Sequence, residues 1–352
     1  MHFKSIGLVV LISLIGVFCF NLTGLPVPWM LGPLFAVLIS QFLIKYELYW
    51  PVKFRNFGLI IVGISIGQAF QMNLLAGAGW LVTFMLLLNI VLVIISIFMA
   101  LGIQKIGNIS LKTALTCTVP GGLAQITVFA EEEKDIDLAV VVFFHVVRII
   151  SIVFLVPFFL SGHIIQASGG DSLELGSIIP IILLIIASYV SAIVGLKLKI
   201  PVSFFLSPVL LLVILNVCSI DTPELPSILL HIAQLFMGAY IGLQLKPEML
   251  KLGKRVLILG IGIALFLLAV TFGQALLLKY FLHYSLATSF LSTAAGGLDQ
   301  MSLLATAVGA DVSVVTVFQM FRLLFVFLVV LPLLKVACSM IDKKNDISIV
   351  KS

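Results

Sequence analysis

Two glycine pairs lie 175 residues apart in apolar surroundings, and each begins the same short pattern. The first reads Pro-Gly-Gly-Leu-Ala-Gln over 120–125, and the second reads Ala-Gly-Gly-Leu-Asp-Gln over 295–300. Glycine lets the backbone approach a ligand closely. A helix that begins at such a pair directs free N–H groups and its positive dipole end toward an anion. The pattern therefore favours binding of a small anion, although glycines that serve only tight helix packing are the competing interpretation.

The polar residues of the two motifs indicate where a ligand would lie. Gln125 and Gln300 occupy matching positions, about one turn into the helix expected after each glycine pair. Asp299 stands where the first motif has Ala124, so one carboxylate breaks the symmetry. Because a packing motif does not explain paired polar residues, we predict a binding site that contains Gly121, Gly122, Gln125, Gly296, Gly297, Asp299 and Gln300.

Two arginines are embedded in long apolar segments. Arg148 lies within 139–160 and Arg322 within 312–334. Each arginine follows an aspartate that precedes its segment, Asp137 or Asp311, by about three helical turns, or roughly 16 Å. This depth is near the middle of a hydrocarbon core about 30 Å thick. An ionisable residue at this depth is a functional hypothesis by default, so we predict that both arginines bind the anion. The alternative is a structural arginine bonded to hairpin carbonyls or, for Arg322, to Asp299.

One titratable side chain lies one turn before the first arginine. His145 precedes Arg148 by three residues, and we name it, with Asp299, as a candidate for proton coupling. A buried, hydrogen-bonded histidine is the competing interpretation. The histidines form no i, i+4 pair and no HExxH motif, and the chain has no P-loop, GxSxG motif or dinucleotide fingerprint. We therefore expect no metal, no cofactor and no enzymatic activity.

The elements that hold these residues are predicted to be membrane helices. The 352 residues are 62 % hydrophobic and only 10 % charged, whereas soluble proteins carry about 25 % charged residues. Mean hydropathy is +1.29. Apolar segments long enough to approach a bilayer's thickness lie at 5–20, 28–44, 56–71, 74–103 and 137–160, and then at 177–196, 201–218, 227–245, 254–282 and 311–337. A signal peptide at the first of these is disfavoured, because the second half begins with a matching span.

The chain carries an internal repeat with a constant offset of 175 residues. Four conformationally special residues of the first half have an identical partner in the second: Pro26, Pro33, Gly63 and Gly67 match Pro201, Pro208, Gly238 and Gly242. Rare residues that keep one register over about a hundred positions indicate a duplication. We predict a first membrane repeat over 1–161 and a second over 162–352.

Loop charges decide between two topologies. If the Gly-Gly segments at 110–131 and 285–307 crossed the membrane fully, the basic clusters at 197–199 and 246–255 would lie outside, against the positive-inside rule. If both segments are re-entrant, every basic cluster lies inside. We therefore predict an all-α polytopic protein of the bacterial inner membrane, with both termini cytoplasmic. It would have two inverted repeats of five transmembrane helices, each with one re-entrant or broken Gly-Gly hairpin.

Three stretches of the sequence resemble one known family. They are Leu-Pro-Val-Pro-Trp-Met-Leu-Gly-Pro-Leu (25–34), Pro-Gly-Gly-Leu (120–123) before a Glu-rich turn, and Gly-Gly-Leu-Asp-Gln-Met (296–301). They are similar to the bacterial AbrB family of duplicated integral membrane proteins, labelled as ammonia monooxygenases or as AbrB family regulators and distinct from the soluble DNA-binding protein of that name. The resemblance covers essentially the whole chain. It departs at Ala295, where the first motif has proline, and its regulatory label implies an effect on gene expression.

The sequence favours a transporter over two other functions. We predict a secondary transporter of a small, anionic solute, with a midplane site between the hairpins and coupling to H⁺ or Na⁺. The alternative is a membrane-embedded sensor or regulator of gene expression, which we would expect to carry a larger cytoplasmic output segment than 45–55 or 338–352. A monooxygenase would need clustered metal ligands. Partners are then the solute, the ion and the bilayer but no nucleic acid, and a homodimer is left open.

Overall fold

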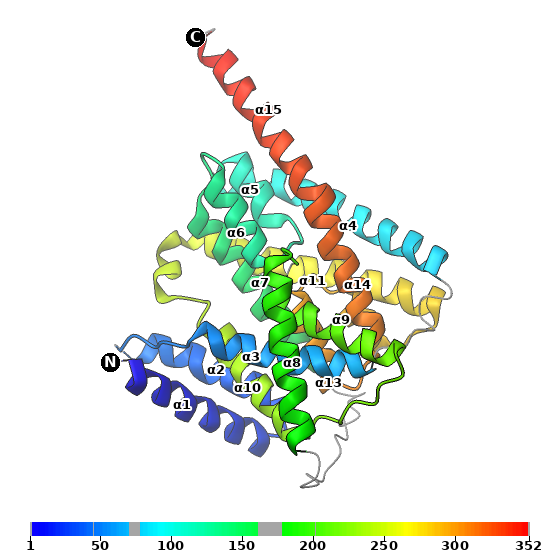
Figure 1. Ribbon diagram of the computed structural model, residues 1–352. Helices are drawn as coiled ribbons and strands as arrows, with labels where there is room; N and C mark the ends of the chain where they lie inside the picture. Colours follow the sequence, from blue (N-terminus) through cyan, green and yellow to red (C-terminus); the bar gives the residue numbers. More distant parts are fainter. Residues whose placement is uncertain (1, 45, 70–77, 161–177, 201, 351–352) are drawn as a thin grey trace. The chain divides into compact units, whose positions relative to one another are not determined.

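The computed structural model describes residues 2–44, 46–69, 78–160, 178–200 and 202–350, and every regular element in these ranges is a helix (Figure 1). The first half contributes α1 (His2–Leu22), α2 (Pro28–Leu43), α3 (Val52–Ala69), α4 (Ala78–Gly107), α5 (Leu111–Thr118), α6 (Leu123–Glu132) and α7 (Leu138–Leu160). The second contributes α8 (Ile178–Lys197), α9 (Ser203–Val217), α10 (Ser227–Gly242), η4 (Pro247–Leu252), α11 (Lys254–Leu282), α12 (Leu286–Thr293), α13 (Leu298–Ala307), α14 (Val312–Phe325), η5 (Val326–Val330) and α15 (Leu331–Val350).

Fewer helices reach membrane-spanning length than the sequence suggested. Within the described residues, seven helices are long and apolar enough to cross a bilayer, where ten were expected. The apolar helices α2 and α9 have only 16 and 15 residues, or about 24 Å at most at 1.5 Å per residue. Both begin directly after a valine in the left-handed conformation, Val27 and Val202. The third difference is α3, which carries Lys53 and Arg55 in its first turn and is not among the seven.

The chain forms two compact units, and both halves of the sequence contribute to each. The first unit contains Met1–Leu74, Val153–Lys246 and Asp299–Thr316, and the second contains Leu75–Ile152, Pro247–Leu298 and Val317–Ser352. The units therefore do not coincide with the two predicted repeats. Helices α7 and α14 contribute residues to both units.

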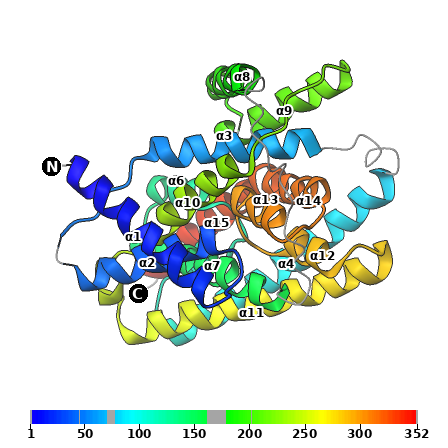
Figure 2. The same cartoon turned by 90° about the horizontal axis from the view of Figure 1, so that it is seen from below.

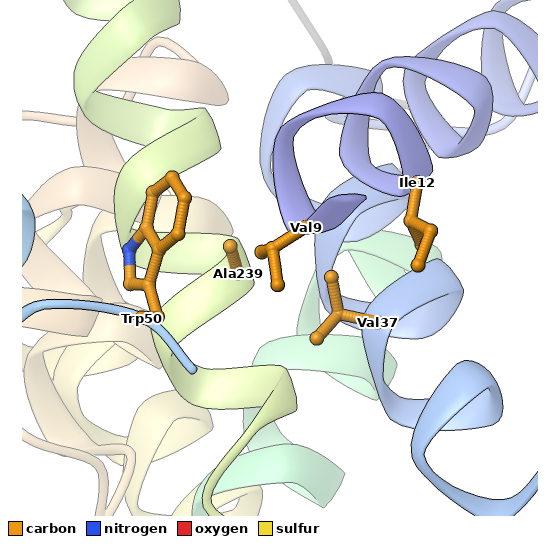
Figure 3. Close-up of a cluster of buried hydrophobic side chains, with 5 residues drawn as sticks. All are labelled: Val9, Ile12, Val37, Trp50 and Ala239. Atoms are coloured by element: carbon orange, nitrogen blue, oxygen red, sulfur yellow. The ribbon is translucent and has the colours of Figure 1, made fainter. Parts of the chain in front are cut away.

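Helix contacts within the first unit are reciprocal between the halves. α2 packs against α1 and α10, while α9 packs against α8 and α3. Glycines allow the closest approaches: a Cβ built on Gly63 of α3 would lie 2.6 Å from the carbonyl oxygen of Phe205, and one built on Gly238 of α10 would lie 2.3 Å from that of Met30. These pairs match at an offset of 175. Figure 3 shows the core beside them, where Val9 and Ile12 of α1, Val37 of α2, Ala239 of α10 and Trp50 meet.

We expect a valine at Gly238 to prevent correct packing of the first unit, because its Cβ would overlap the backbone of α2 rather than a movable side chain. Overpacking of this kind costs about 1–3 kcal/mol, and occasionally more where backbone must move. Gly262→Val is the matched control, because nothing lies within 4 Å of a Cβ at Gly262 of α11. Unfolding temperature in detergent is the measurement, and equal values for the two variants would contradict the contact.

The second unit holds two short helices on two long ones. α4 and α11 pack against each other (Figure 2), α5 packs on α4, and α12 packs on α11. Ser110 and Ser285 begin α5 and α12 in the same way, since each hydroxyl accepts a bond from the backbone N–H three residues later. Such capping satisfies one of the free donors at a helix start. The first-half and second-half short helices are therefore built alike.

A buried lysine joins the C-terminal helix to α5. Lys112 pairs with Asp342 of α15, lies 4.0 Å from Asp135 and donates to the Lys134 carbonyl at 3.2 Å. Burial lowers the pKa of Lys112, but the bond and charge of Asp342 together with the charge of Asp135 outweigh it, so its pKa lies above the usual 10.5. Lys112 is therefore charged at neutral pH and fixes one end of α5.

Candidate functional site

Both Gly-Gly segments are helices broken at the glycines. α5 ends at Thr118 and α6 begins at Leu123, while α12 ends at Thr293 and α13 begins at Leu298. The arms have eight and ten residues, so each is about 12–15 Å long and covers about half of a hydrocarbon core. At each break the glycine N–H bonds back two residues, Gly121 to Val119 and Gly296 to Ala294, both at 2.8 Å. Neither arm is long enough to span a membrane alone.

The glycines at the breaks do not serve the left-handed conformation. Within the described chain the glycines with positive φ are Gly24, Gly253 and Gly309, and Gly122 is extended with φ −71° and ψ 138°. Close approach is therefore what Gly121 provides, and Gly122 leaves space open. A Cβ on Gly121 would lie 3.0 Å from Ile126 and 3.2 Å from Val326, whereas one on Gly122 would meet only Gln125, with Oε1 at 3.6 Å.

Arg148 of α7 donates hydrogen bonds to carbonyls at the first break. Its side chain is buried, and Nη1 donates to the Val119 carbonyl at 2.9 Å while Nη2 donates to the Gly121 carbonyl at 2.8 Å. The last carbonyls of a helix lack partners within it, and a guanidinium fork can bond two of them at once. The long apolar helix α7 thus places its arginine on the end of α5.

Arg322 fastens the second break in the same manner. Nη1 donates to the carbonyls of Ala294 at 2.6 Å and Thr293 at 3.1 Å, and Nη2 donates to the Gly296 carbonyl at 2.9 Å. Gln319, one turn earlier, donates to the Leu291 and Ala294 carbonyls and accepts a bond from Arg322. Of the two structural alternatives for Arg322, the hairpin carbonyls are the partners present.

His145 occupies the position in α7 that Gln319 occupies in α14. It is fully buried, and its Nδ1 lies 2.9 Å from the Val141 carbonyl of its own helix. His145 is thus buried and bonded to its own helix at Nδ1, while its Nε2 has no hydrogen-bond partner. Its role in coupling stays a prediction.

The second unit concentrates positive charge at the breaks. Arg148 and Arg322 are only 2 % and 5 % exposed. In the part of this unit that the structure describes, neither forms an ion pair with a carboxylate. Buried atoms of this unit without a hydrogen-bond partner include Arg148 Nε, Gln125 Oε1 and His145 Nε2. Positive charge without a carboxylate partner would favour an anion.

Arg322 also lines a small polar cavity in the second unit. Asn89 of α4, Gln274 of α11, and Ser292 and Thr293 of α12 contribute to its wall. The cavity measures about 10 Å³, near the smallest volume that holds one water molecule. The cavity is therefore too small for a solute larger than water.

Asp299 and Gln300 belong to the first unit, whereas the other candidate residues belong to the second. Asp299 Oδ2 lies 3.8 Å from Nη2 of Arg55, and the Arg55 guanidinium lies 5.0 Å from the centre of the Tyr240 ring. Asp299 and Gln300 are each 6 % exposed, and Asp299 Oδ2 and Gln300 Oε1 have no hydrogen-bond partner. Within this unit the two residues form a second, separate polar group.

Arg55 is a functional candidate that the sequence analysis did not single out, because a basic residue beside an apolar segment fits the positive-inside rule without any further role. A signal was present in the repeat: Arg55 matches Leu230, and Asp299 matches Ala124. Both members of the ion pair therefore replace apolar residues of the other half. Elsewhere in the described chain, no group of three or more His, Cys, Asp or Glu side chains could hold a metal ion.

Comparison with known proteins places the chain in a family. The family model described as "Transition state regulatory protein AbrB" matches residues 29–337. "Uncharacterized protein YhjN" of Bacillus subtilis (strain 168) is 24 % identical and aligns with 95 % of this chain and 94 % of its own length. "Putative regulator AbrB" of Escherichia coli (strain K12) is 26 % identical, over 92 % of this chain and 93 % of its own. Matched over most of its length, the chain belongs to the AbrB family.

Proposed function

We propose that the protein is a secondary transporter of a small anionic solute. The observation that carries this proposal is the pair of buried guanidinium groups without carboxylate partners in the described part of the second unit. Two buried positive charges in an apolar interior are costly, and hydrogen bonds to carbonyls reduce this cost only in part. An anion bound at the breaks of the second unit would compensate this charge.

The proposed site combines backbone and side chains at the two breaks. α6 begins at Gly122 without a side-chain cap, so its first N–H groups and its dipole are available to an anion. Gln125 adds a half-buried amide whose Oε1 atom has no hydrogen-bond partner, and we assign the role that matches Gly122 to Gly297 at the second break. Arg148 and Arg322 hold the hairpin tips in place, and the spare Nε of Arg148 contributes a donor.

The proposed topology has two inverted halves, with both Gly-Gly segments re-entrant and both termini cytoplasmic in the bacterial inner membrane. The recurrence of equivalent bonds supports it, since Arg148 and Arg322 reach carbonyls that match at an offset of 175. The reciprocal contacts of α3 with α9 and of α10 with α2 also support it. Such halves commonly form the substrate site of secondary transporters where they meet.

We expect residues 104–112 and 246–255 to face the cytoplasm and residues 219–225 to face outward. The basic residues of the first two segments favour this orientation. The measurement is labelling of single cysteines by a membrane-impermeant maleimide in whole cells, with Lys251→Cys and Asp221→Cys in a protein whose own cysteines are replaced. Labelling of Lys251→Cys in intact cells would contradict the inverted arrangement.

A membrane-embedded regulator is the second candidate, and the names of the family and of the Escherichia coli relative favour it. A transporter could produce such an effect indirectly by changing the cellular level of its solute. We propose no catalytic activity and no nucleic-acid partner for either case. A direct regulator would change transcription even when its solute-binding residues are replaced.

Binding of anions to the purified protein tests the proposed site. We expect at least one member of a panel of small organic and inorganic anions to raise the unfolding temperature in detergent. At one hundred times its dissociation constant a ligand stabilises the folded state by about 2.7 kcal/mol. Gly122→Val should abolish this rise. A rise of equal size in the variant would reject the site, and no rise with any anion would reject the anionic substrate.

A further inference from the structure

We propose that Asp299 binds the proton that drives transport, and that Arg55 is the displaceable counter-ion that links this proton to an oxyanion solute. The inference rests on the transport function proposed above and gives it a coupling mechanism. It concerns the polar group of the first unit, formed by Arg55 of α3, Tyr240 of α10 and Asp299 of α13.

The ion pair is loose and partly open to solvent. Arg55 Nη2 and Asp299 Oδ2 are 3.8 Å apart, longer than a hydrogen bond of about 2.7–3.2 Å. The side chain of Arg55 is 26 % exposed and that of Asp299 is 9 % exposed. Arg55 Nε and Asp299 Oδ2 are both buried atoms without a hydrogen-bond partner. A proton and an anion would each find unused bonding capacity here.

Arg55 differs in this respect from the two arginines of the second unit. Arg148 and Arg322 donate both Nη atoms to hairpin carbonyls, so their forks are occupied by the backbone. Arg55 instead lies against the face of the Tyr240 ring, where a guanidinium is held by about 0.5–2 kcal/mol. Leaving such a contact costs less than breaking several charged hydrogen bonds, so Arg55 is the arginine that can move.

The ion pair of Arg55 and Asp299 occupies positions at which the two halves of the repeat differ. The residues that match Arg55 and Asp299 in the opposite half are Leu230 and Ala124. Arg55 and Asp299 are thus both polar, whereas the residues at the matching positions are both apolar. This paired replacement indicates that Arg55 and Asp299 act together.

The charges give the order of events. With Asp299 ionised, its carboxylate compensates Arg55. Protonation of Asp299 removes this compensation, and the guanidinium fork can then bind a carboxylate or phosphate group in bidentate fashion. The charged and titratable groups around this pair in the first unit are few. The charge of Arg55 acts on Asp299, which is the ionisable residue of α13. Tyr240 is the titratable group beside Arg55. Proton and solute therefore bind together and move in one direction, as in symport.

Infrared titration in nanodiscs tests the proton site without knowledge of the solute. The carboxylic-acid band that is lost in Asp299→Asn identifies Asp299, and its intensity is followed against pH. We expect Arg55→Gln to move the titration midpoint upward by about one pH unit or more, because an opposite charge nearby favours the ionised form. Lys53→Gln, a neighbouring exposed cation on the same helix, should leave it unchanged, and Arg55→Lys should stay near wild type. An equal midpoint in wild type and Arg55→Gln would overturn the proposal.

Release of Arg55 is measured by its reaction with phenylglyoxal, followed by peptide mass spectrometry. Exposed Arg255 is the internal reference. At a fixed pH, Asp299→Asn should increase the modification of Arg55 relative to Arg255 several-fold over wild type. An unchanged ratio would reject displacement of Arg55. Failure of the transport function is seen separately, as absent uptake by wild-type protein in which Asp299 still titrates.

Discussion

Replacing Arg322 or Arg148 with glutamine is expected to reduce the amount of folded protein sharply. Arg322 loses three hydrogen bonds to carbonyls at the second break, and Arg148 loses two at the first. A hydrogen bond to a charged group contributes about 1.5–3 kcal/mol, which is a large share of a stability of about 5–15 kcal/mol. Monodisperse yield from detergent extracts and the unfolding temperature are the measurements.

The fork of the guanidinium explains why lysine should not substitute. An ammonium is a compact charge and does not present two parallel donors, so Arg322→Lys and Arg148→Lys should recover little of the lost stability. Arg255→Gln is the control, because Arg255 is an exposed arginine in the same unit. Glutamine variants with the wild-type unfolding temperature would show that these bonds do not hold the breaks together.

Replacing Gly122 with valine is expected to abolish anion binding while the protein remains folded. A Cβ at Gly122 meets only Gln125 Oε1 at 3.6 Å, so the fold tolerates it. The added branch would cover the start of α6 and the amide of Gln125, where we place the ligand. Anion-dependent stabilisation measures the loss, and monodisperse yield measures folding.

Gly121→Val is the informative partner of this variant. Its Cβ would press on Ile126 and Val326 at 3.0 and 3.2 Å, so we expect it to lose stability as well as binding. If Gly122→Val binds anions as wild type does, the first break is not a ligand site. Equal destabilisation by both valines would mean that the two glycines serve packing alone.

Much of the helical arrangement follows from apolar length and glycine position. The sequence prediction for 254–282 coincides with α11, and the interruptions at Gly121 and Gly296 coincide with the two breaks. Apolarity marked 28–44 and 201–218 as candidate spans, yet α2 and α9 have only 16 and 15 residues, too few to cross a hydrocarbon core about 30 Å thick. Chain order also gives no account of the two compact units, because contacts such as Gly238 with Met30 join distant segments.

The sequence indicated which residue types would matter in the candidate site, but it did not indicate the hydrogen-bond partners of those residues. Intramembrane position marked Arg148 and Arg322 as important, yet their bonds go to main-chain carbonyls, which no side-chain pattern encodes. Asp299 stood out because it breaks the repeat. Arg55 also differs from its matching residue, Leu230. The positive-inside rule already explains a basic residue near the start of a membrane helix, so Arg55 did not stand out in the sequence. Only the approach of α3 to α13 within the first unit brings the pair together.

Uptake of anions by proteoliposomes tests the transport function most directly. Purified protein is reconstituted into vesicles, and a panel of radiolabelled small carboxylates and phosphate is offered with and without an inward proton gradient. We predict that at least one anion accumulates only with protein, faster with the gradient, and not with Gly122→Val or Asp299→Asn. Folded wild-type protein that moves none of these anions under either condition would contradict the account.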